Sequence, residues 1–284
     1  MHHGGNDQDW IWLLAGTGDG VPIASALTAA GWRVEVSVVT ASAAMAYRHL
    51  TVAAVHQGPL LGDTAIARML ERRPSAVIDA THPFAVRISD ALRRVCRQQS
   101  KRLLRFERPV LFPEPKAAGR QLYPCVQGLQ HVGQLNRQAL QGSRLFIALG
   151  ARHLAEAATA AEGAGAQVFA RVLPSRDGVC QALAVGLPEG HLAVVHPRSD
   201  QPIGAMEAAL CRRWQITDVL CRESGGVTEG VWRDLAGRLS LRLWLLQRPE
   251  PPVGVEIVSD HAALLRHLHH DGPHQIDARG DNCV

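Results

Sequence analysis

The sequence predicts a protein of the α/β class with two lobes, each built from a parallel sheet flanked by helices. Two observations lead to this expectation. Short apolar runs alternate with helix-like segments along most of the chain, and one proline-containing stretch, residues 108–119, interrupts the alternation. The chain has 284 residues and 46% hydrophobic content, which is enough for two separate cores.

The expected first lobe repeats a strand followed by a helix, the pattern that gives a parallel sheet covered on both faces. The strands are short and apolar, and Gly31 closes the first helix. The expected strands are Trp10–Ala15, Arg33–Val39, Val52–Val55, Ala76–Ala80 and Arg102–Phe106, and the expected helices are Val21–Ala30, Asp63–Glu71 and Ile88–Gln99.

After the interruption the same alternation resumes and predicts a second α/β lobe. The expected strands here are Leu145–Leu149, Gln167–Val172, Leu192–Val195, Asp218–Cys221 and Leu241–Leu246, with helices that include Arg152–Ala161 and Ala205–Arg213. A second proline cluster, RPEPP at residues 248–252, precedes one more short strand and a helix that ends near Leu268. We therefore expect a first domain over residues 9–110, a second over 111–268, and a frayed polar tail over 269–284.

Composition argues against several classes of protein. The net charge is +4 without a basic run, so nucleic-acid binding is not expected. No apolar stretch approaches the roughly 20 residues of a membrane helix, and the N-terminus lacks a secretory signal, so we expect a cytoplasmic protein. The six cysteines are widely spaced, without histidines at ligand spacing, which argues against disulfides and a metal site. The oligomeric state stays open.

Arginine supplies 28 of the 30 basic residues, because Lys101 and Lys116 are the only lysines. Two explanations stay open. The planar guanidinium grips carboxylates and phosphates with two hydrogen bonds, which suits a polyanionic ligand. A coding bias toward arginine accounts for the same count.

The segment Gly16-Thr17-Gly18-Asp19 follows the first expected strand directly and precedes a helix with Pro22 in its first turn. Glycines at such a turn let the backbone approach a diphosphate, and the N–H groups of the helix start attract its charge. The chain has valine where the full G-x-G-x-x-G pattern has its third glycine. We expect a dinucleotide site here, and a tight turn that binds nothing is the alternative.

The end of the second strand bears on the choice of cofactor. A typical NAD site has an acid there that binds the ribose 2′-hydroxyl. Here the chain reads Val39-Thr40-Ala41-Ser42, followed by Arg48. Hydroxyl groups and an arginine tolerate a 2′-phosphate, so we expect NADPH, with NADH as the alternative; Arg48 could equally be a solvated helix residue.

The segment DATHPF at residues 79–84 begins where the fourth strand ends. Ligands of open parallel sheets bind beyond the carboxyl ends of the strands, so Asp79, Thr81 and His82 should face the same crevice as the glycine turn. Pro83 should rigidify the exit and start the next helix, with Thr81 or His82 near its cap. A histidine at the reactive end of a cofactor could donate a proton after hydride transfer. Alternatively, Asp79 and Thr81 only cap the helix.

The motifs argue against three other enzyme classes and leave one binding protein as an alternative. The Tyr-x-x-x-Lys pair of short-chain dehydrogenases and the G-x-S-x-G elbow of hydrolases are both absent. A glycine turn also suits S-adenosylmethionine, but that cofactor usually needs an acid where this chain has Thr40. A non-catalytic, NADPH-binding redox sensor is the remaining alternative from a different class.

In this combination the motifs resemble those of the precorrin-6A and cobalt-precorrin-6A reductases of cobalamin biosynthesis. The matching segments are the G-T-G-D turn, DATHPFAVRIS at residues 79–89, LRFERP at 104–109, ARVLPS at 170–175, RESGG at 222–226 and LWLLQRP at 243–249. They occur in the family's order from about Trp10 to Leu268. The resemblance implies two Rossmann-like lobes with the nicotinamide cofactor in the interlobe cleft, and hydride transfer to a ring double bond of a tetrapyrrole, the corrin-precursor macrocycle, to give precorrin-6B or its cobalt form.

The resemblance also implies roles for particular residues, with His82 and Asp79 as the catalytic candidates. The implied cofactor-binding residues are Gly16, Thr17, Gly18, Asp19, Thr40, Thr81 and Pro83, and the implied substrate-binding residues are Arg222, Glu223, Ser224 and Gly225. The chain departs from the family pattern at Ala15, at Arg222, and at residues 196–200, where it reads HPRSD. Arg198 could supply a replacement contact with the substrate in that loop. Whether the substrate contains cobalt is left open.

Overall fold

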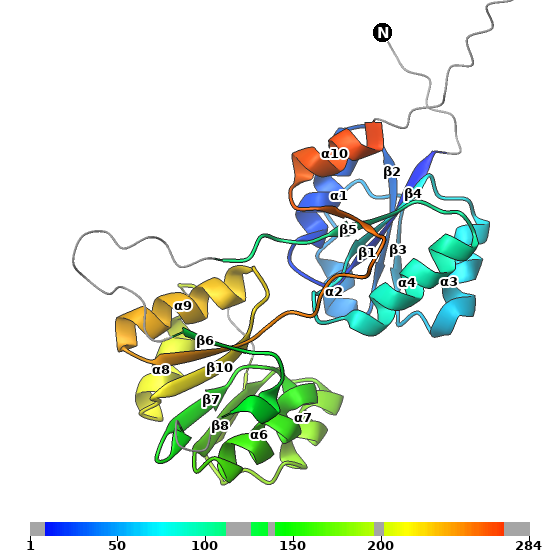
Figure 1. Ribbon diagram of the computed structural model, residues 1–284. Coiled ribbons are helices and arrows are strands. Elements are labelled where there is room, and N and C mark those ends of the chain that lie inside the picture. The colour runs from blue at the N-terminus through cyan, green and yellow to red at the C-terminus, as the bar shows by residue number, and fades with distance from the viewer. Residues whose placement is uncertain (1–8, 112–125, 136–139, 196–201, 270–284) are drawn as a thin grey trace, which may run out of the picture. The chain divides into compact units, whose positions relative to one another are not determined.

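The computed structural model describes residues 9–111, 126–135, 140–195 and 202–269, and the chain divides into two compact units (Figure 1). Unit 1 comprises Met1–Arg108 with Pro249–Val284, and unit 2 comprises Pro109–Arg248. Each unit contains one six-stranded sheet whose neighbouring strands are parallel. The expected α/β class with two parallel sheets flanked by helices is confirmed.

The sheet of unit 1 has the strand order β3-β2-β1-β4-β5-β12. Its strands are β1 (Trp10–Ala15), β2 (Arg33–Val38), β3 (Ala54–Gln57), β4 (Ala76–Ala80), β5 (Leu103–Phe106) and β12 (Glu256–Val258). Its helices are α1 (Gly20–Ala29), α2 (Ala41–Met45), α3 (Gly62–Glu71), α4 (Val86–Gln98) and α10 (His261–His269). Strands β2 and β3 are added on one side of β1, and β4 and β5 on the other, so the order of the strands reverses between β1 and β4. Dinucleotides bind at that point in sheets of this order.

Strand β1 is buried along its whole length because helices cover both faces of the sheet. Leu13 belongs to the same core as Leu264 of α10, whereas its neighbour Trp12 belongs to a second core with Ile66 of α3 and Leu92 of α4. Successive side chains of a strand point to opposite faces, so a strand between two helix layers is apolar at every position. The continuous run WIWLLA therefore predicts the buried first strand correctly.

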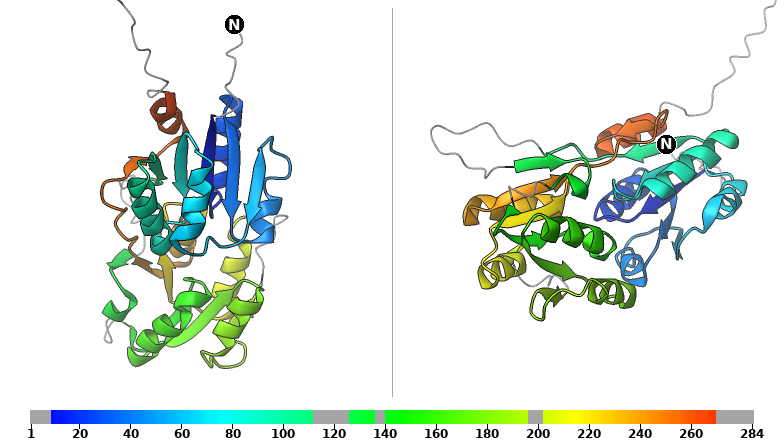
Figure 2. Two further views of the ribbon diagram at one scale, coloured as in Figure 1. Left: turned by 90° about the vertical axis from the view of Figure 1, so that its right-hand side faces the viewer. Right: turned by 60° about the horizontal axis from the view of Figure 1, so that its bottom comes forward.

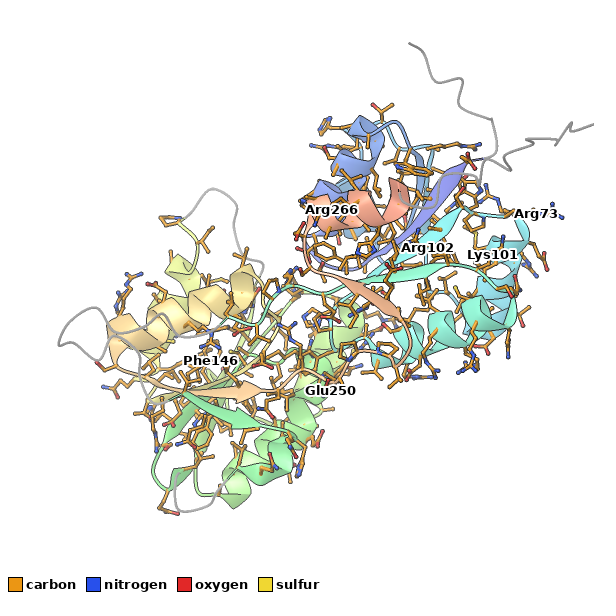
Figure 3. All side chains as sticks on the ribbon, turned by 45° about the horizontal axis from the view of Figure 1, so that its top comes forward. Arg73, Lys101, Arg102, Phe146, Glu250 and Arg266 are labelled. Carbon is orange, nitrogen blue, oxygen red and sulfur yellow. The ribbon has the colours of Figure 1, made fainter. Side chains whose placement is uncertain are left out.

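Residues 249–268 belong to unit 1 and not to the second domain, where the sequence placed them. Strand β12 pairs with β5. Arg102, which is labelled in Figure 3, donates from Nη1 to the carbonyl oxygen of His267 at 2.8 Å and from Nη2 to Glu256 at 3.2 Å. In both views of Figure 2 the orange end of the chain lies with the blue and cyan elements of unit 1. The proline cluster at residues 248–252 is thus a second crossing between units; the expected tail lies outside the described residues after His269.

The sheet of unit 2 has the strand order β9-β8-β7-β10-β11-β6. Its strands are β6 (Val126–Leu129), β7 (Arg144–Ile147), β8 (Gln167–Val172), β9 (Leu192–Val194), β10 (Asp218–Arg222) and β11 (Arg242–Leu246). Its helices are α6 (Leu154–Gly163), α7 (Arg176–Leu183), α8 (Ala205–Arg213) and α9 (Val227–Leu239), with one-turn helices η1 (Val132–Gln134) and η2 (Ala151–His153). Phe146 of β7, which is labelled in Figure 3, belongs to the core of unit 2. Its ring lies edge-on to those of Trp214 and Trp232.

In both sheets the first five strands have the same order, third-second-first-fourth-fifth, counted along the chain from β1 and from β7. In each sheet the sixth strand lies next to a segment where the chain passes between the units. Strand β6 precedes the other strands of unit 2 in the sequence, and β12 follows all of unit 2. The sequence pattern does not predict β6, because only Leu129 of its four residues is buried. The other expected strands agree with the structure to within two residues at each end. Among the described helices, none has the length and apolar content needed to span a bilayer.

Candidate active site

The glycine turn and the DATHPF loop are direct neighbours in unit 1. Strands β1 and β4 are adjacent and parallel, with Ala15 opposite Ala80, so the two segments that follow them leave the same edge of the sheet. A Cβ atom built on Gly16 would lie 3.9 Å from both the backbone nitrogen of His82 and the Cα of Thr81. The structure therefore brings together the two motifs that the sequence assigned to one crevice.

Gly18, the second glycine of the turn, leaves open space at the start of α1. None of Gly16, Gly18 and Gly20 has a left-handed φ, so the local backbone does not itself require glycine. A Cβ on Gly18 would meet no atom of the described chain within 4 Å. The fold would accept a side chain there, and its absence leaves room for a ligand. This opening beside the N-terminus of a ten-residue helix fits the diphosphate of a dinucleotide.

Gly20 differs from Gly18 because the packing of the protein leaves no room for a side chain at this position. A Cβ on Gly20 would lie 2.1 Å from the hydroxyl oxygen of Tyr47 and 2.6 Å from the Cβ of Ala15. Burial raises the pKa of Tyr47 to about 12, which agrees with a hydroxyl held inside the core. In dinucleotide folds the third glycine permits this close contact between helix and strand. The G-x-G-x-x-G pattern places that glycine at position 21, whereas in the structure Gly20 makes the close contact between helix and strand.

The carboxylate of Asp79 is buried, with 2% of the side chain exposed, and its oxygens are bound within the protein. Oδ1 accepts from the backbone nitrogen of Thr81 at 3.0 Å and from its hydroxyl at 2.7 Å. Oδ2 lies 2.8 Å from Nη1 of Arg105. Asp79 thus holds the loop that carries His82, an arrangement that suits a positioning residue better than an acid or base that contacts substrate.

Arg105 of β5 is the residue at this site that the sequence did not reveal. Its side chain is 2% exposed, and Nε lies 2.8 Å from Oε1 of Glu107. Nη1 also donates to the hydroxyls of Thr81 and of Ser89 in α4, both at 3.0 Å. Burial alone would lower the pKa of Arg105, but the charges of Asp79 and Glu107 outweigh it and raise the pKa. The arginine stays charged and ties strand, loop and helix together.

A signal for this network was present in the motif LRFERP. Arg105 and Glu107 are two residues apart and therefore point to the same face of a strand. Arg105 also stands opposite Asp79 in the register of β4 and β5. The sequence alone does not predict the ion pairs of Arg105 with Asp79 and Glu107, because they depend on the pairing of β4 with β5.

His82 is half-buried, and its ring takes part in the geometry of the loop. The backbone nitrogen of Phe84 donates to Nδ1 of His82 at 3.2 Å. Because Nδ1 accepts, a neutral ring carries its proton on Nε2. The next helix begins at Val86 after the N-cap residue Ala85, so Pro83 does not start it and neither Thr81 nor His82 caps it. The hydroxyl of Thr81 bonds to Asp79, and the expected cap does not form because the helix begins five residues after Thr81.

Thr40 lies at the expected place beyond the end of β2. It is exposed and is the N-cap residue of α2, where its hydroxyl accepts from the backbone nitrogen of Ala43 at 3.2 Å and contacts the hydroxyl of Ser42 at 3.1 Å. The sequence contains no acid between Glu35 and Asp63. The edge next to the glycine turn therefore presents hydroxyl groups without a carboxylate.

The predicted substrate residues of unit 2 follow one strand. Arg222 ends β10, and Glu223, Ser224 and Gly225 connect it to α9, which begins at Val227. Glu223 accepts from the backbone nitrogen of Arg248 at 3.2 Å, and Gly225 donates to the buried Glu229 at 2.8 Å. These contacts fix the loop backbone.

Arg222 itself is half-buried at the carboxyl end of the sheet. Burial and the nearby charge of Arg152 lower its pKa, and burial together with Arg222 lowers that of His153. Arg152 and His153 belong to η2, so two loops bring like charges together here, and the sequence did not single out this pair. Arg198 lies outside the described residues.

Comparisons with known proteins agree along nearly the whole chain. The chain is 32% identical over 244 residues to "Cobalt-precorrin-6A reductase" of Synechocystis sp., covering 84% of this chain and 88% of the relative. It is 29% identical to "Precorrin-6A reductase" of Mycobacterium tuberculosis, covering 90% and 96%. A solved structure, "CobK precorrin-6A reductase", has the same fold with a TM-score of 0.71 at 22% identity, covering 93% of this chain and 98% of that one.

A family model described as "Precorrin-6x reductase CbiJ/CobK" matches residues 10–269, which include every described element of both units. The glycine turn, the DATHPF loop and the loop after β10 all fall within the matched region. The chain belongs to the precorrin-6x reductase family CbiJ/CobK.

Proposed function

We propose that this protein reduces precorrin-6A or cobalt-precorrin-6A by transferring hydride from a nicotinamide dinucleotide to one ring double bond of the macrocycle. Membership in a reductase family implies a nicotinamide cofactor in general. The observation that carries the proposal is the proximity of the glycine turn to the His82 loop: a Cβ atom added to Gly16 would lie 3.9 Å from the backbone nitrogen of His82. The names of the relatives support the substrate.

The proposed cofactor-binding residues divide into three groups along the edge of unit 1. Gly16 and Gly18 admit the diphosphate, and the N-terminus of α1 attracts its charge. Thr40 and Ser42 offer hydroxyl groups where an acid would repel a 2′-phosphate, which favours NADPH over NADH. Thr81 and Pro83 belong to the loop beside the nicotinamide end. When bound, the cofactor supplies the hydride.

The network beneath the loop positions the catalytic residue. The hydroxyl of Thr81 donates to Asp79 and accepts from Arg105, and these two bonds restrain the residue directly before His82. We place the proton that His82 offers on Nε2, because Nδ1 accepts from Phe84. This proton would go to the carbon next to the one that receives hydride. Water can deliver it as well, so His82 assists the reaction without being essential.

Binding of the macrocycle is assigned to the arginine at the end of β10. The carboxylate side chains of the macrocycle match a guanidinium that is half-buried and close to the charge of Arg152. Ser224 is buried, and Glu223 and Gly225 are fixed by bonds to the protein itself, so they shape the loop that presents Arg222. Arg198 remains a proposed further contact.

The deciding experiment is an anaerobic reduction followed by absorbance. The purified protein is incubated with metal-free or cobalt-loaded substrate and with NADPH or NADH in all four combinations. We expect substrate-dependent oxidation of the dinucleotide, faster with NADPH, and the metal preference follows from the pair that reacts. Binding of NADPH without any consumption would contradict the proposal and favour the redox sensor.

A further inference from the structure

An acidic residue stands at the start of α1, where the proposed diphosphate is bound. Asp19 is the N-cap residue of the helix, but its side chain makes no capping hydrogen bond to the helix. Its Oδ2 accepts from the hydroxyl of Thr17 at 3.0 Å. A carboxylate so close to a helix N-terminus competes with any other anion for the positive end of the helix. Asp19, which the family resemblance implies as a cofactor-binding residue, would therefore oppose a polyanionic dinucleotide unless its charge is compensated.

The compensating charge comes from the far end of the LRFERP motif. Nη2 of Arg108 lies 2.5 Å from the same Oδ2 of Asp19, and the two side chains are 18% and 26% exposed. A pair shielded to this degree interacts more strongly than a fully exposed one. Arg108 is the last residue of the first segment of unit 1, just before Pro109 begins the crossing. The ion pair thus links the segment that follows β5 to the glycine turn.

We propose that Arg108 is a determinant of cofactor affinity, because its guanidinium neutralises Asp19 at the phosphate-binding start of α1. This inference rests on the proposed function, since it takes a nicotinamide dinucleotide as the ligand. It assigns a role to a residue outside the glycine turn and the DATHPF loop. Motif LRFERP then serves both loops of the site: Arg105 supports the His82 loop, and Arg108 compensates the charge in the glycine turn.

The test is a double-variant cycle read out by dinucleotide binding, without turnover. Dissociation constants for NADPH and NADH are measured by fluorescence for the wild type, Arg108→Gln, Asp19→Asn and the double variant. We expect Arg108→Gln to weaken binding of both dinucleotides about tenfold, because it exposes one uncompensated carboxylate beside the diphosphate that they share. Adding Asp19→Asn should restore the affinity to within about threefold of the wild type, since the repelling charge is then gone.

Two further variants separate charge compensation from a general loss of structure. Arg108→Lys keeps the positive charge and should retain most of the affinity. Arg94→Gln removes an arginine from an exposed ion pair with Asp63, 2.6 Å apart, which joins α4 to α3. It changes the net charge by the same amount and should leave the dissociation constant unchanged. Circular dichroism and thermal unfolding of every variant show that native protein is being compared.

The outcomes separate this inference from the proposed function. If the wild type binds neither NADPH nor NADH, both fail. If the wild type binds and Arg108→Gln binds equally well, the role of Arg108 is refuted while the proposed function stands. A double variant as weak as Arg108→Gln would refute charge compensation, because Asp19 would then not be the source of the loss. Restoration of binding in the double variant supports it.

Discussion

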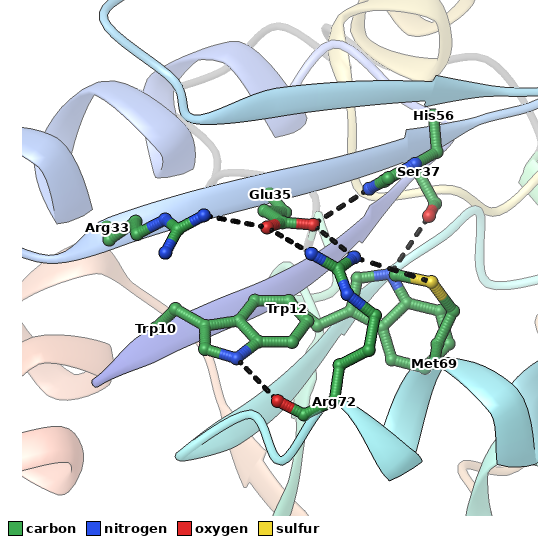
Figure 4. A network of polar contacts seen from close by, with 8 residues as sticks. All are labelled: Trp10, Trp12, Arg33, Glu35, Ser37, His56, Met69 and Arg72. Atoms are coloured by element: carbon green, nitrogen blue, oxygen red, sulfur yellow. Dashed lines mark hydrogen bonds and ion pairs between the residues drawn. The ribbon is translucent and has the colours of Figure 1, made fainter. Parts of the chain in front are cut away.

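Two buried carboxylates of the same sheet are each paired with an arginine, yet their surroundings differ. Glu35 of β2 is 1% exposed and accepts from both terminal nitrogens of Arg72, at 2.6 and 2.7 Å, in the network of Figure 4. Asp79 of β4 is 2% exposed and pairs with Arg105. The Arg72 side chain is 44% exposed, however, whereas that of Arg105 is 2% exposed.

The two networks also join different parts of unit 1. The Glu35 network connects β2 to β3 through His56 and to the end of α3 through Arg72, whose guanidinium also lies over the ring of Trp10 (Figure 4). All of these are parts of the scaffold. The Asp79 network ends in Thr81, which belongs to the loop of the site. The same kind of ion pair therefore joins parts of the scaffold in one place and holds the loop that we propose to be catalytic in the other.

The largest expected effect is that of Arg105→Ala, which tests the network under the loop. Removing the arginine leaves Asp79 and Glu107 buried without their shared partner, so the free energy of unfolding should fall by about 3–5 kcal/mol. The remaining native protein should also bind NADPH more weakly and turn over more slowly. Urea unfolding gives the first quantity, and titration of the native fraction gives the second. Full activity in that fraction would contradict a positioning role.

Substitutions two residues apart in the glycine turn separate packing from ligand binding. Gly20→Ala places a methyl group against Tyr47 and Ala15 and should cost about 1–3 kcal/mol or more by overpacking. Gly18→Ala meets no described atom within 4 Å, so stability should hold while affinity for NADPH falls. Thermal unfolding and fluorescence titration measure the two effects. Unchanged NADPH affinity in Gly18→Ala would show that the diphosphate does not bind next to Gly18.

Arg72→Ala is the matched control for Arg105→Ala. Glu35 keeps His56 at 2.9 Å and Arg33 at 3.5 Å, and the exposed side of the network admits water. The loss of unfolding free energy should therefore be smaller, about 1–2 kcal/mol. NADPH affinity and turnover of the native fraction should stay at wild-type values. An equal loss of activity in both arginine variants would show that the two networks are not functionally distinct.

The Glu35 network should also give a pH dependence of stability. Burial by itself raises the pKa of Glu35, but the hydrogen bonds and charges of Arg72 and His56 outweigh it and lower the pKa from its usual value of 4.5. A carboxyl with a lowered pKa stabilises the fold above its unfolded pKa, and this contribution is lost as the pH falls through the folded value. The stability difference between the wild type and Glu35→Gln should thus shrink below about pH 4.5. Urea unfolding from pH 3 to 7 measures it, and a difference independent of pH would contradict the ion pairs.

The smallest effect on stability is expected for His82→Ala. The ring is half-buried in a loop, so unfolding should change little, while turnover should fall about tenfold because water can replace the proton on Nε2. His56→Ala is the matched substitution in the other network and should do the reverse, lowering stability and sparing turnover. A loss beyond about a thousandfold in His82→Ala would make the histidine the required proton donor.

Local patterns in the sequence determined most of the scaffold. The continuous run WIWLLA specifies a strand buried on both faces, and DATHPF, which begins at Asp79 within strand Ala76–Ala80 and continues past its end, specifies a polar loop at a strand end. The glycine turn between a strand and a helix is equally local. Each of these signals depends on residues within one or two elements, and periodicity and turn chemistry are properties of such short stretches.

The tertiary structure decided which distant residues meet. Strand β12 completes the first sheet although all of unit 2 lies between it and β5, and Arg105 finds Asp79 only through the pairing of β4 with β5. Gly20 is indispensable because Tyr47, 27 residues later, packs its hydroxyl there. Spacing in the sequence does not encode such contacts, because they arise from strand order and close packing, which the chain acquires only when the cores of the two units form.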